Sequence, residues 1–217
     1  MQLWRFAKLL TFAQCPLDRW YPPAPTPDES MNQKAFDDSG PTEKAISIIK
    51  MSESKLTGKY TRSLGAWNGL EKNGSASIML RLNMAGISMV ELSSNGINGF
   101  LYNSAVQRVI LESVKIWPNA LFVEAGPYKY VDEKVFDDRP GVGWMLYLPC
   151  ELSQQQVPEA RHLRYVFDDN HKLLGTIISS VVEGKTFDVD NPEHVKVAND
   201  IEIRLVDQDL LPLYANL

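Results

Sequence analysis

The feature that most constrains this chain is a continuous apolar block at residues 141–149, Gly-Val-Gly-Trp-Met-Leu-Tyr-Leu-Pro. A half-buried strand alternates apolar and polar side chains, whereas an uninterrupted apolar run bounded by glycine and proline is typical of a strand covered on both faces. The block is far shorter than the ~20 apolar residues of a membrane span, and no other stretch reaches that length. The sequence therefore predicts a central strand of a buried sheet, in a protein without a membrane-spanning segment.

Other segments have the periodicity of helices and strands. Apolar residues recur every three or four positions in residues 42–56, 104–117 and 191–210, which predicts three helices. In the last of these, Asp190 or Asn191 is the expected N-cap, and Ile201 or Glu202 falls on the inner face. Short apolar runs predict strands at residues 77–81, 87–92, 121–125, 163–167 and 175–182. Because hairpins outnumber crossovers, we expect an α+β fold, a largely antiparallel sheet with helices packed on one face.

The length of 217 residues suits a single domain over residues 1–217. Five prolines within residues 15–30 predict an extended loop, because proline fixes φ and removes backbone donors. Trp20 and Tyr21 begin this loop, where they either pack along the domain or contact a partner. Packing is the expected outcome.

Charge and cysteine content exclude several classes of protein. The formal net charge is -5 with both signs interspersed, so the chain lacks the basic surface that provides most nucleic-acid affinity. Cys15 and Cys150 are the two cysteines, which predicts reduced thiols and no structural zinc. Arg5 and Lys8 interrupt the apolar N-terminus before a signal peptide is complete. We therefore expect a cytoplasmic protein that does not bind nucleic acid directly.

Motifs for catalysis or cofactor binding are not found in the sequence. His162, His171 and His194 lack the spacing of metal ligands, and no phosphate-binding glycine loop or nucleophile elbow occurs. A nucleophile built from Cys150 and a histidine is possible in principle, but a buried thiol at a strand end is the better interpretation. We expect no catalytic residue, cofactor or metal ion.

Paired aspartates are the remaining feature that can bind a ligand or take part in catalysis. Phe-Asp-Asp occurs three times, at residues 36–38, 136–138 and 167–169. Such pairs can bind a divalent cation or mimic phosphates, but they also begin turns, in which Asp accepts hydrogen bonds from its own backbone. We favour the turn interpretation over metal catalysis, and leave a protein-binding role open for one or two pairs.

Beyond these patterns, the sequence resembles the immunity protein 52 family of bacterial polymorphic toxin systems. The residues of the resemblance are 139–149 (Arg-Pro-Gly-Val-Gly-Trp-Met-Leu-Tyr-Leu-Pro), 157–160 (Val-Pro-Glu-Ala), 175–178 (Gly-Thr-Ile-Ile), 191–194 (Asn-Pro-Glu-His) and 201–203 (Ile-Glu-Ile). The resemblance is strong over the C-terminal third of the chain and weaker over the middle. The weaker part includes Trp67 and the helix that ends at Trp117-Pro118. The proline-rich loop has no counterpart in it.

The resemblance implies a non-enzymatic protein that binds and neutralises a cognate toxin, often a nuclease delivered by type VI secretion. The expected contact face is acidic with aromatic anchors, opposite basic residues of the toxin. The candidate toxin-binding residues are Trp20, Tyr21, Asp137, Asp138, Asp168 and Asp169. The alternatives are a small metal-dependent hydrolase that uses the aspartate pairs, and a scaffold or chaperone of a secretion system.

Overall fold

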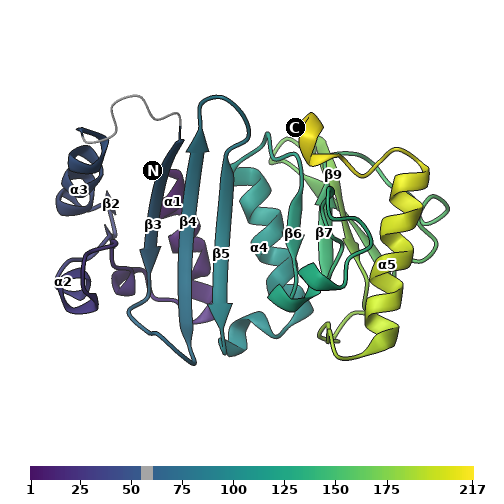
Figure 1. The fold of residues 1–217 in the computed structure, drawn as a ribbon, viewed down its shortest axis with the longest axis horizontal. Coiled ribbons are helices and arrows are strands. Elements are labelled where there is room, and N and C mark those ends of the chain that lie inside the picture. The colour runs from purple at the N-terminus through teal and green to yellow at the C-terminus, as the bar shows by residue number, and fades with distance from the viewer. Residues whose placement is uncertain (55–60) are drawn as a thin grey trace. The chain divides into compact units, whose positions relative to one another are not determined.

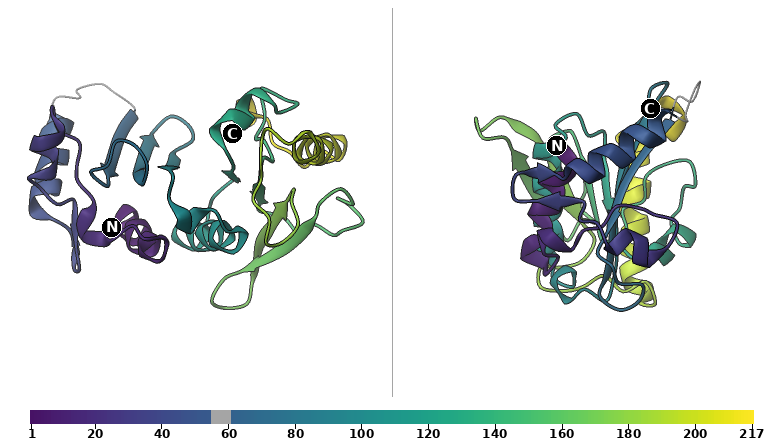
Figure 2. Two further views of the ribbon diagram at one scale, coloured as in Figure 1. Left: turned by 90° about the horizontal axis from the view of Figure 1, so that it is seen from below. Right: turned by 90° about the vertical axis from the view of Figure 1, so that its left-hand side faces the viewer.

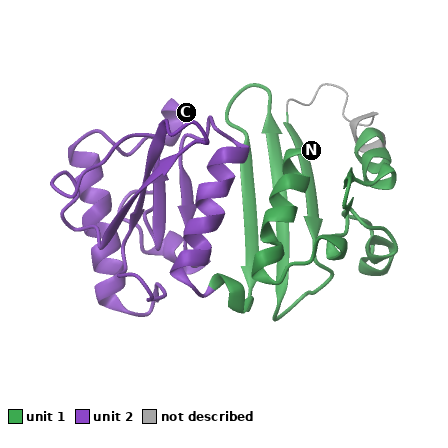
Figure 3. Ribbon diagram, turned by 180° about the vertical axis from the view of Figure 1, so that it is seen from behind, with its two compact units in different colours: residues 1–100 green, residues 101–217 purple. Residues whose placement is uncertain are grey.

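The computed structural model describes residues 1–54 and 61–217, which divide into two compact units, Met1–Phe100 and Leu101–Leu217 (Figure 3). Each unit contains antiparallel sheets and helices, so the α+β class is confirmed. A single domain over residues 1–217 stays a prediction. None of the helices in the described ranges has the length and apolarity to cross a membrane.

Unit 1 combines a three-stranded antiparallel sheet, in the order β3-β4-β5, with a short two-stranded ribbon, β1-β2 (Figure 1). Buried residues alternate along β4, where Ala76, Ile78 and Leu80 face the same side. α1 covers this side and contributes buried Phe6 (Figure 3). The elements of unit 1 are α1 (Gln2–Leu9), α2 (Pro27–Met31), β1 (Phe36–Asp37), β2 (Gly40–Pro41), α3 (Glu43–Ser54), β3 (Thr61–Trp67), β4 (Ser75–Asn83) and β5 (Met89–Asn95).

Two features of unit 1 differ from the sequence-based expectations. Residues 15–30 are not one extended loop, because they include a 3₁₀ turn at Leu17–Arg19 and the start of α2, which Thr26 caps. β3 was missed, because its polar residues and Gly65 hide the strand pattern in the sequence. α3 and the strand pair β4-β5 lie where they were predicted. Leu56, which was expected on the same face of that helix, lies outside the described residues.

Unit 2 is built on a four-stranded antiparallel sheet in the order β6-β7-β9-β8. The strands predicted at residues 163–167 and 175–182 overlap β8 and β9, which pair as a hairpin. The helix capped by Asn191 is confirmed, and Asn191 Oδ1 accepts a hydrogen bond from Glu193 N at 3.0 Å. The elements are α4 (Asn103–Ile116), β6 (Val123–Ala125), the 3₁₀ helix η4 (Tyr128–Asp132), β7 (Met145–Leu148), β8 (His162–Phe167), β9 (Leu173–Ser179) and α5 (Pro192–Asp207).

The apolar block forms the centre of unit 2. All four residues of β7 are buried although successive side chains point to opposite faces, so both faces of the sheet are covered as the sequence predicted. Figure 2 shows α4 and α5 on opposite sides of this sheet, whereas we had expected helices on one face. Ile110 and Val114 of α4 belong to the same buried cluster as Ile201 and Leu205 of α5.

Candidate functional site

The sequence-predicted site residues occur in both units. Trp20 is fully buried in unit 1, so the packing interpretation is confirmed for its side chain, which is not available to contact a partner. Tyr21 is half-buried, and its backbone pairs with that of Trp67 in an isolated bridge. Prolines next to aromatic residues were visible in the sequence, but this pattern does not distinguish a buried arm from an exposed one.

The two aspartate pairs of unit 2 have different roles. Asp168 is a turn residue, since its Oδ1 accepts hydrogen bonds from the backbone N–H groups of Asn170 and Lys172, both at 2.8 Å. Asp137 and Asp138 are exposed, and only their backbone carbonyls make hydrogen bonds that fix the loop, to Lys134 Nζ and Tyr214 N. The side chains of Asp137 and Asp138 therefore face solvent in the described structure.

Asp137 and Asp138 end a segment, residues 128–138, that exposes several apolar side chains. The exposed fraction is 90% for Tyr128, 56% for Val131 and 40% for Val135. Asp132 and Glu133 lie between them and are also exposed. Aromatic and apolar side chains with an acidic surround match the composition of protein-binding surfaces. We refer to residues 128–138 as the presented segment.

Glu202 of α5 makes hydrogen bonds to the presented segment from its buried side. Its side chain is fully buried, and Oε2 accepts a hydrogen bond from Val135 N at 2.8 Å. Oε1 accepts from Val142 N at 2.9 Å and lies 2.6 Å from the hydroxyl oxygen of Tyr130, the buried residue of η4. One carboxyl group therefore joins η4, the loop after it and the start of the apolar block to α5.

Further contacts fix the remainder of the loop. Lys134 Nζ donates to Arg139 O at 3.0 Å and lies 5.3 Å from the ring centre of Tyr214. The guanidinium of Arg139 donates to the backbone carbonyl of Leu211. These contacts connect the C-terminal end of the presented segment to the residues that follow it and to Leu211.

Glu124 of β6 is the second carboxyl group beneath the loop. The residue is exposed as a whole, but its carboxylate turns inward and accepts a hydrogen bond from Gly141 N. Burial of the carboxylate raises the pKa of Glu124, and burial likewise raises the pKa of Glu202. Carboxyl groups with perturbed pKa values also occur in active sites, but Glu202 is enclosed by its own chain and cannot touch a substrate. Glu202 therefore has a structural role, which is to bind the backbone of the loop.

The groups considered for catalysis do not converge. Among the described residues, no group of three or more His, Cys, Asp or Glu side chains is arranged to hold a metal ion. Burial raises the pKa of the Cys150 thiol, which disfavours the thiolate that a nucleophile requires. His194 Nδ1 accepts a hydrogen bond from Asp188 N at 3.0 Å, so it has a role in the loop before α5.

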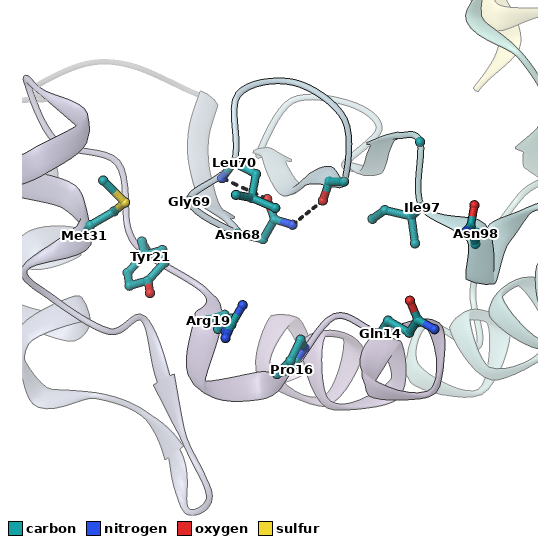
Figure 4. A pocket seen from close by; sticks show the side chains of 12 residues that line it. Gln14, Pro16, Arg19, Tyr21, Met31, Asn68, Gly69, Leu70, Ile97 and Asn98 are labelled. Carbon is teal, nitrogen blue, oxygen red and sulfur yellow. Dashed lines mark hydrogen bonds between the residues drawn. The ribbon is translucent and has the colours of Figure 1, made fainter.

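Unit 1 contains a cavity of about 490 Å³, shown in Figure 4. Tyr21, Met31 and Leu70 form its apolar wall, and Arg19 supplies a cation. Asn68 is committed to the fold, because its Oδ1 accepts from Ala76 N at 2.9 Å and its Nδ2 donates to Gly74 O at 2.7 Å. A shallower groove of about 410 Å³ in unit 2 lies beside Glu133 and the start of α5.

Comparison of the chain with models of known families gave no match, and comparison with curated proteins gave none either. The resemblance to the immunity protein 52 family therefore stays a prediction from the residues quoted above. Sequence reasoning missed Glu202, Tyr130 and Tyr128 as site residues. The one available indication was a charged residue, Glu202, on the apolar face of the last predicted helix.

Proposed function

We propose that this chain is an immunity protein that binds and neutralises a cognate bacterial toxin in the cytoplasm of the producing cell, without catalysis. The observation that supports binding most directly is the presented segment, in which Tyr128 and Val131 are exposed while the Tyr130 hydroxyl and Val135 N are hydrogen-bonded to buried Glu202. An aromatic side chain on a segment that hydrogen bonds hold in place loses less conformational entropy on binding than one on a free loop, which favours tight association. The identification of the partner as a toxin comes from the sequence resemblance.

Charge supports a basic partner, such as a nuclease of a type VI or related secretion system. Unit 2 has 18 acidic and 11 basic residues, whereas unit 1 has nine acidic and 11 basic residues. The acidic excess of the chain therefore belongs to unit 2, which also includes the presented segment. An acidic face attracts the positively charged nucleic-acid site of a nuclease and increases the rate of association.

Co-expression tests the proposed function. The product of the gene adjacent to this one is expressed in a bacterial host alone and together with the full chain. We expect growth arrest by the neighbour alone and recovery with this chain. A scaffold or chaperone would bind the neighbour without removing its toxicity, and a toxin that still kills in the presence of this chain would contradict immunity.

Substitution of Tyr128 tests the presented segment. We expect Tyr128→Ala to weaken the affinity for the toxin at least tenfold, because an exposed aromatic anchor contributes about 2 kcal/mol or more when buried at an interface. Isothermal titration calorimetry with the purified toxin measures the change. Tyr102→Ala, which removes a tyrosine that is 67% exposed outside the segment, is the matched control. Equal affinities of the two variants and the wild type would place the interface elsewhere.

The aspartate pairs are compared in the same assay. Asp137→Ser with Asp138→Ser removes two charges from the presented segment, and we expect weaker binding that depends less on salt. Asp168→Asn with Asp169→Asn removes two charges from the hairpin while retaining the Oδ1 acceptor that holds its turn. Unchanged affinity in both double variants would dismiss the acidic contact.

A further inference from the structure

Tyr130 has one hydroxyl hydrogen, yet its oxygen lies within hydrogen-bonding distance of two acceptor oxygens. The distances are 2.6 Å to Glu202 Oε1 and 2.8 Å to Asn199 Oδ1. A phenol donates a single hydrogen bond, so an ionised Glu202 and Asn199 would compete for the same hydrogen. One of the two short oxygen contacts would then have no hydrogen in it.

The orientation of the Asn199 side-chain amide follows from the hydrogen bond that its Nδ2 atom donates. Its Nδ2 donates to Glu133 O at 3.1 Å, and a flipped amide would place an acceptor against this carbonyl. Asn199 Oδ1 therefore faces Tyr130 and accepts the phenolic hydrogen. The hydrogen in the remaining contact, between Tyr130 and Glu202, has to come from Glu202.

We propose that Glu202 is protonated in the folded protein and acts as a positioning residue for the presented segment, donating its hydrogen to Tyr130 while Tyr130 donates to Asn199. Each short contact among these three side chains then contains one hydrogen. The carboxyl oxygens still accept from Val135 N and Val142 N. The consequence for partner binding rests on the proposed function, but the protonation does not.

The charged and titratable groups around Glu202 are consistent with this state. Lys134 favours the ionised form, but its Nζ is held by the backbone carbonyls of the loop. The carboxylate of Glu124 and the phenols of Tyr130 and Tyr214 are the other titratable groups that interact with Glu202, and a negative charge on Glu124 disfavours a second one. Burial is the largest influence and raises the pKa of Glu202 despite the hydrogen bonds it accepts.

The raised pKa of Glu202 determines how the stability of the fold depends on pH. A carboxyl whose pKa is higher in the folded than in the unfolded state stabilises the fold fully below the unfolded value, about 4.3 for Glu. This contribution is lost as the pH rises through the raised pKa of Glu202. At higher pH Tyr130 donates to the carboxylate, Asn199 loses its hydrogen bond, and the segment opens more often.

The direct test is a ¹³C NMR titration of the Glu202 side-chain carboxyl carbon in the full chain, with the resonance identified by its absence in E202Q. We expect the chemical shift of a protonated carboxyl at about pH 7, and a midpoint above the ordinary value near 4.3. The chemical shift of a carboxylate at about pH 7, or a midpoint at or below the ordinary value, overturns the proposal. If E202Q does not fold, through-bond correlation from the backbone of the wild type gives the same assignment.

Amide hydrogen exchange of Val135 and Val142 provides a second readout. After correction for intrinsic exchange, we expect the opening constant of the wild type to rise up to tenfold per pH unit between about 4.3 and the midpoint, because opening releases one proton. E202Q should lack this rise, whereas Glu193→Gln, which removes an exposed carboxylate of the same helix, should keep it. Equal pH profiles in the wild type and E202Q would contradict the proposal. Both measurements use the chain without a partner, so their failure leaves the immunity proposal standing, and failed neutralisation leaves the protonation standing.

Discussion

At the residue scale, two carboxyl groups in contact with α5 respond to the fold in opposite directions. Glu202 is buried without an ion-pair partner in direct contact among the described residues, and burial raises its pKa despite the attraction of Lys134. Glu159 is only partly buried and accepts hydrogen bonds from Arg204 Nε at 3.1 Å and Nη2 at 2.7 Å, which lower its pKa. The different environments follow from position, since Glu202 lies on the inner face of the helix and Arg204 on its outer side.

Glu159→Gln should therefore destabilise the protein in a pH-dependent way. A carboxyl with a lowered pKa contributes stability above its unfolded value, about 4.3, and loses it as the pH falls through the lowered value. We expect a small decrease in the urea midpoint at about pH 7 and no difference at about pH 2, because the ion pair is partly exposed to solvent. A decrease of equal size at both pH values would show that packing, and not charge, accounts for the effect.

At the element scale, α5 links the core of unit 2 to the presented segment. Its buried residues include Ala198, Ile201 and Leu205, which pack in the core beside the sheet, and Glu202, which binds the loop. In its first turn, the side chain of the N-cap Asn191 accepts a hydrogen bond from the backbone N–H of Glu193, and Pro192 has no amide hydrogen that needs an acceptor. Displacement of the start of α5 would therefore affect both the core and the segment.

Asn191→Ala tests this dependence. The substitution removes the acceptor for Glu193 N, and loss of such a cap costs about 1 kcal/mol. Urea denaturation followed by circular dichroism should show this decrease in the free energy of unfolding. Asn191→Ser retains a capping oxygen and serves as the control, so an equal loss in both variants would assign the effect to something other than the cap.

At the scale of the whole molecule, one hydrophobic cluster of buried residues lies entirely within unit 2. The cluster runs in sequence from Ile110 to Leu211 and includes both helices and the central strands of that unit. A unit that contains its own complete core satisfies the main requirement for folding alone. The presented segment and its anchor Glu202 are also contained in it.

We therefore expect residues 101–217 to fold when expressed without unit 1. A cooperative urea transition and a dispersed amide NMR spectrum would demonstrate this, and the same fragment should retain the raised pKa of Glu202. An uncooperative transition would instead support the expectation that residues 1–217 form one inseparable domain. The fragment also offers a test of whether toxin binding needs the residues of unit 1.

The sequence by itself determined the elements whose pattern has one physical explanation. The uninterrupted apolar block, bounded by glycine and proline, favours a strand with two covered faces, and Asp190-Asn191-Pro192 favours a helix start. The three helices and the β8-β9 hairpin follow from the same local rules. β3 escaped prediction because the polar residues and glycine in it are stabilised by pairing with β4, which a local pattern does not record.

Only the tertiary structure decided which residues form the candidate site. Trp20 and Asp168 were selected for their residue type, but burial and turn hydrogen bonds commit them to the fold. The contacts of Glu202 span 60 to 72 positions in the sequence, from Val142 to Tyr130. Because burial and long-range hydrogen bonding depend on packing among distant segments, no periodicity or spacing in the sequence determines which exposed residues they hold in place.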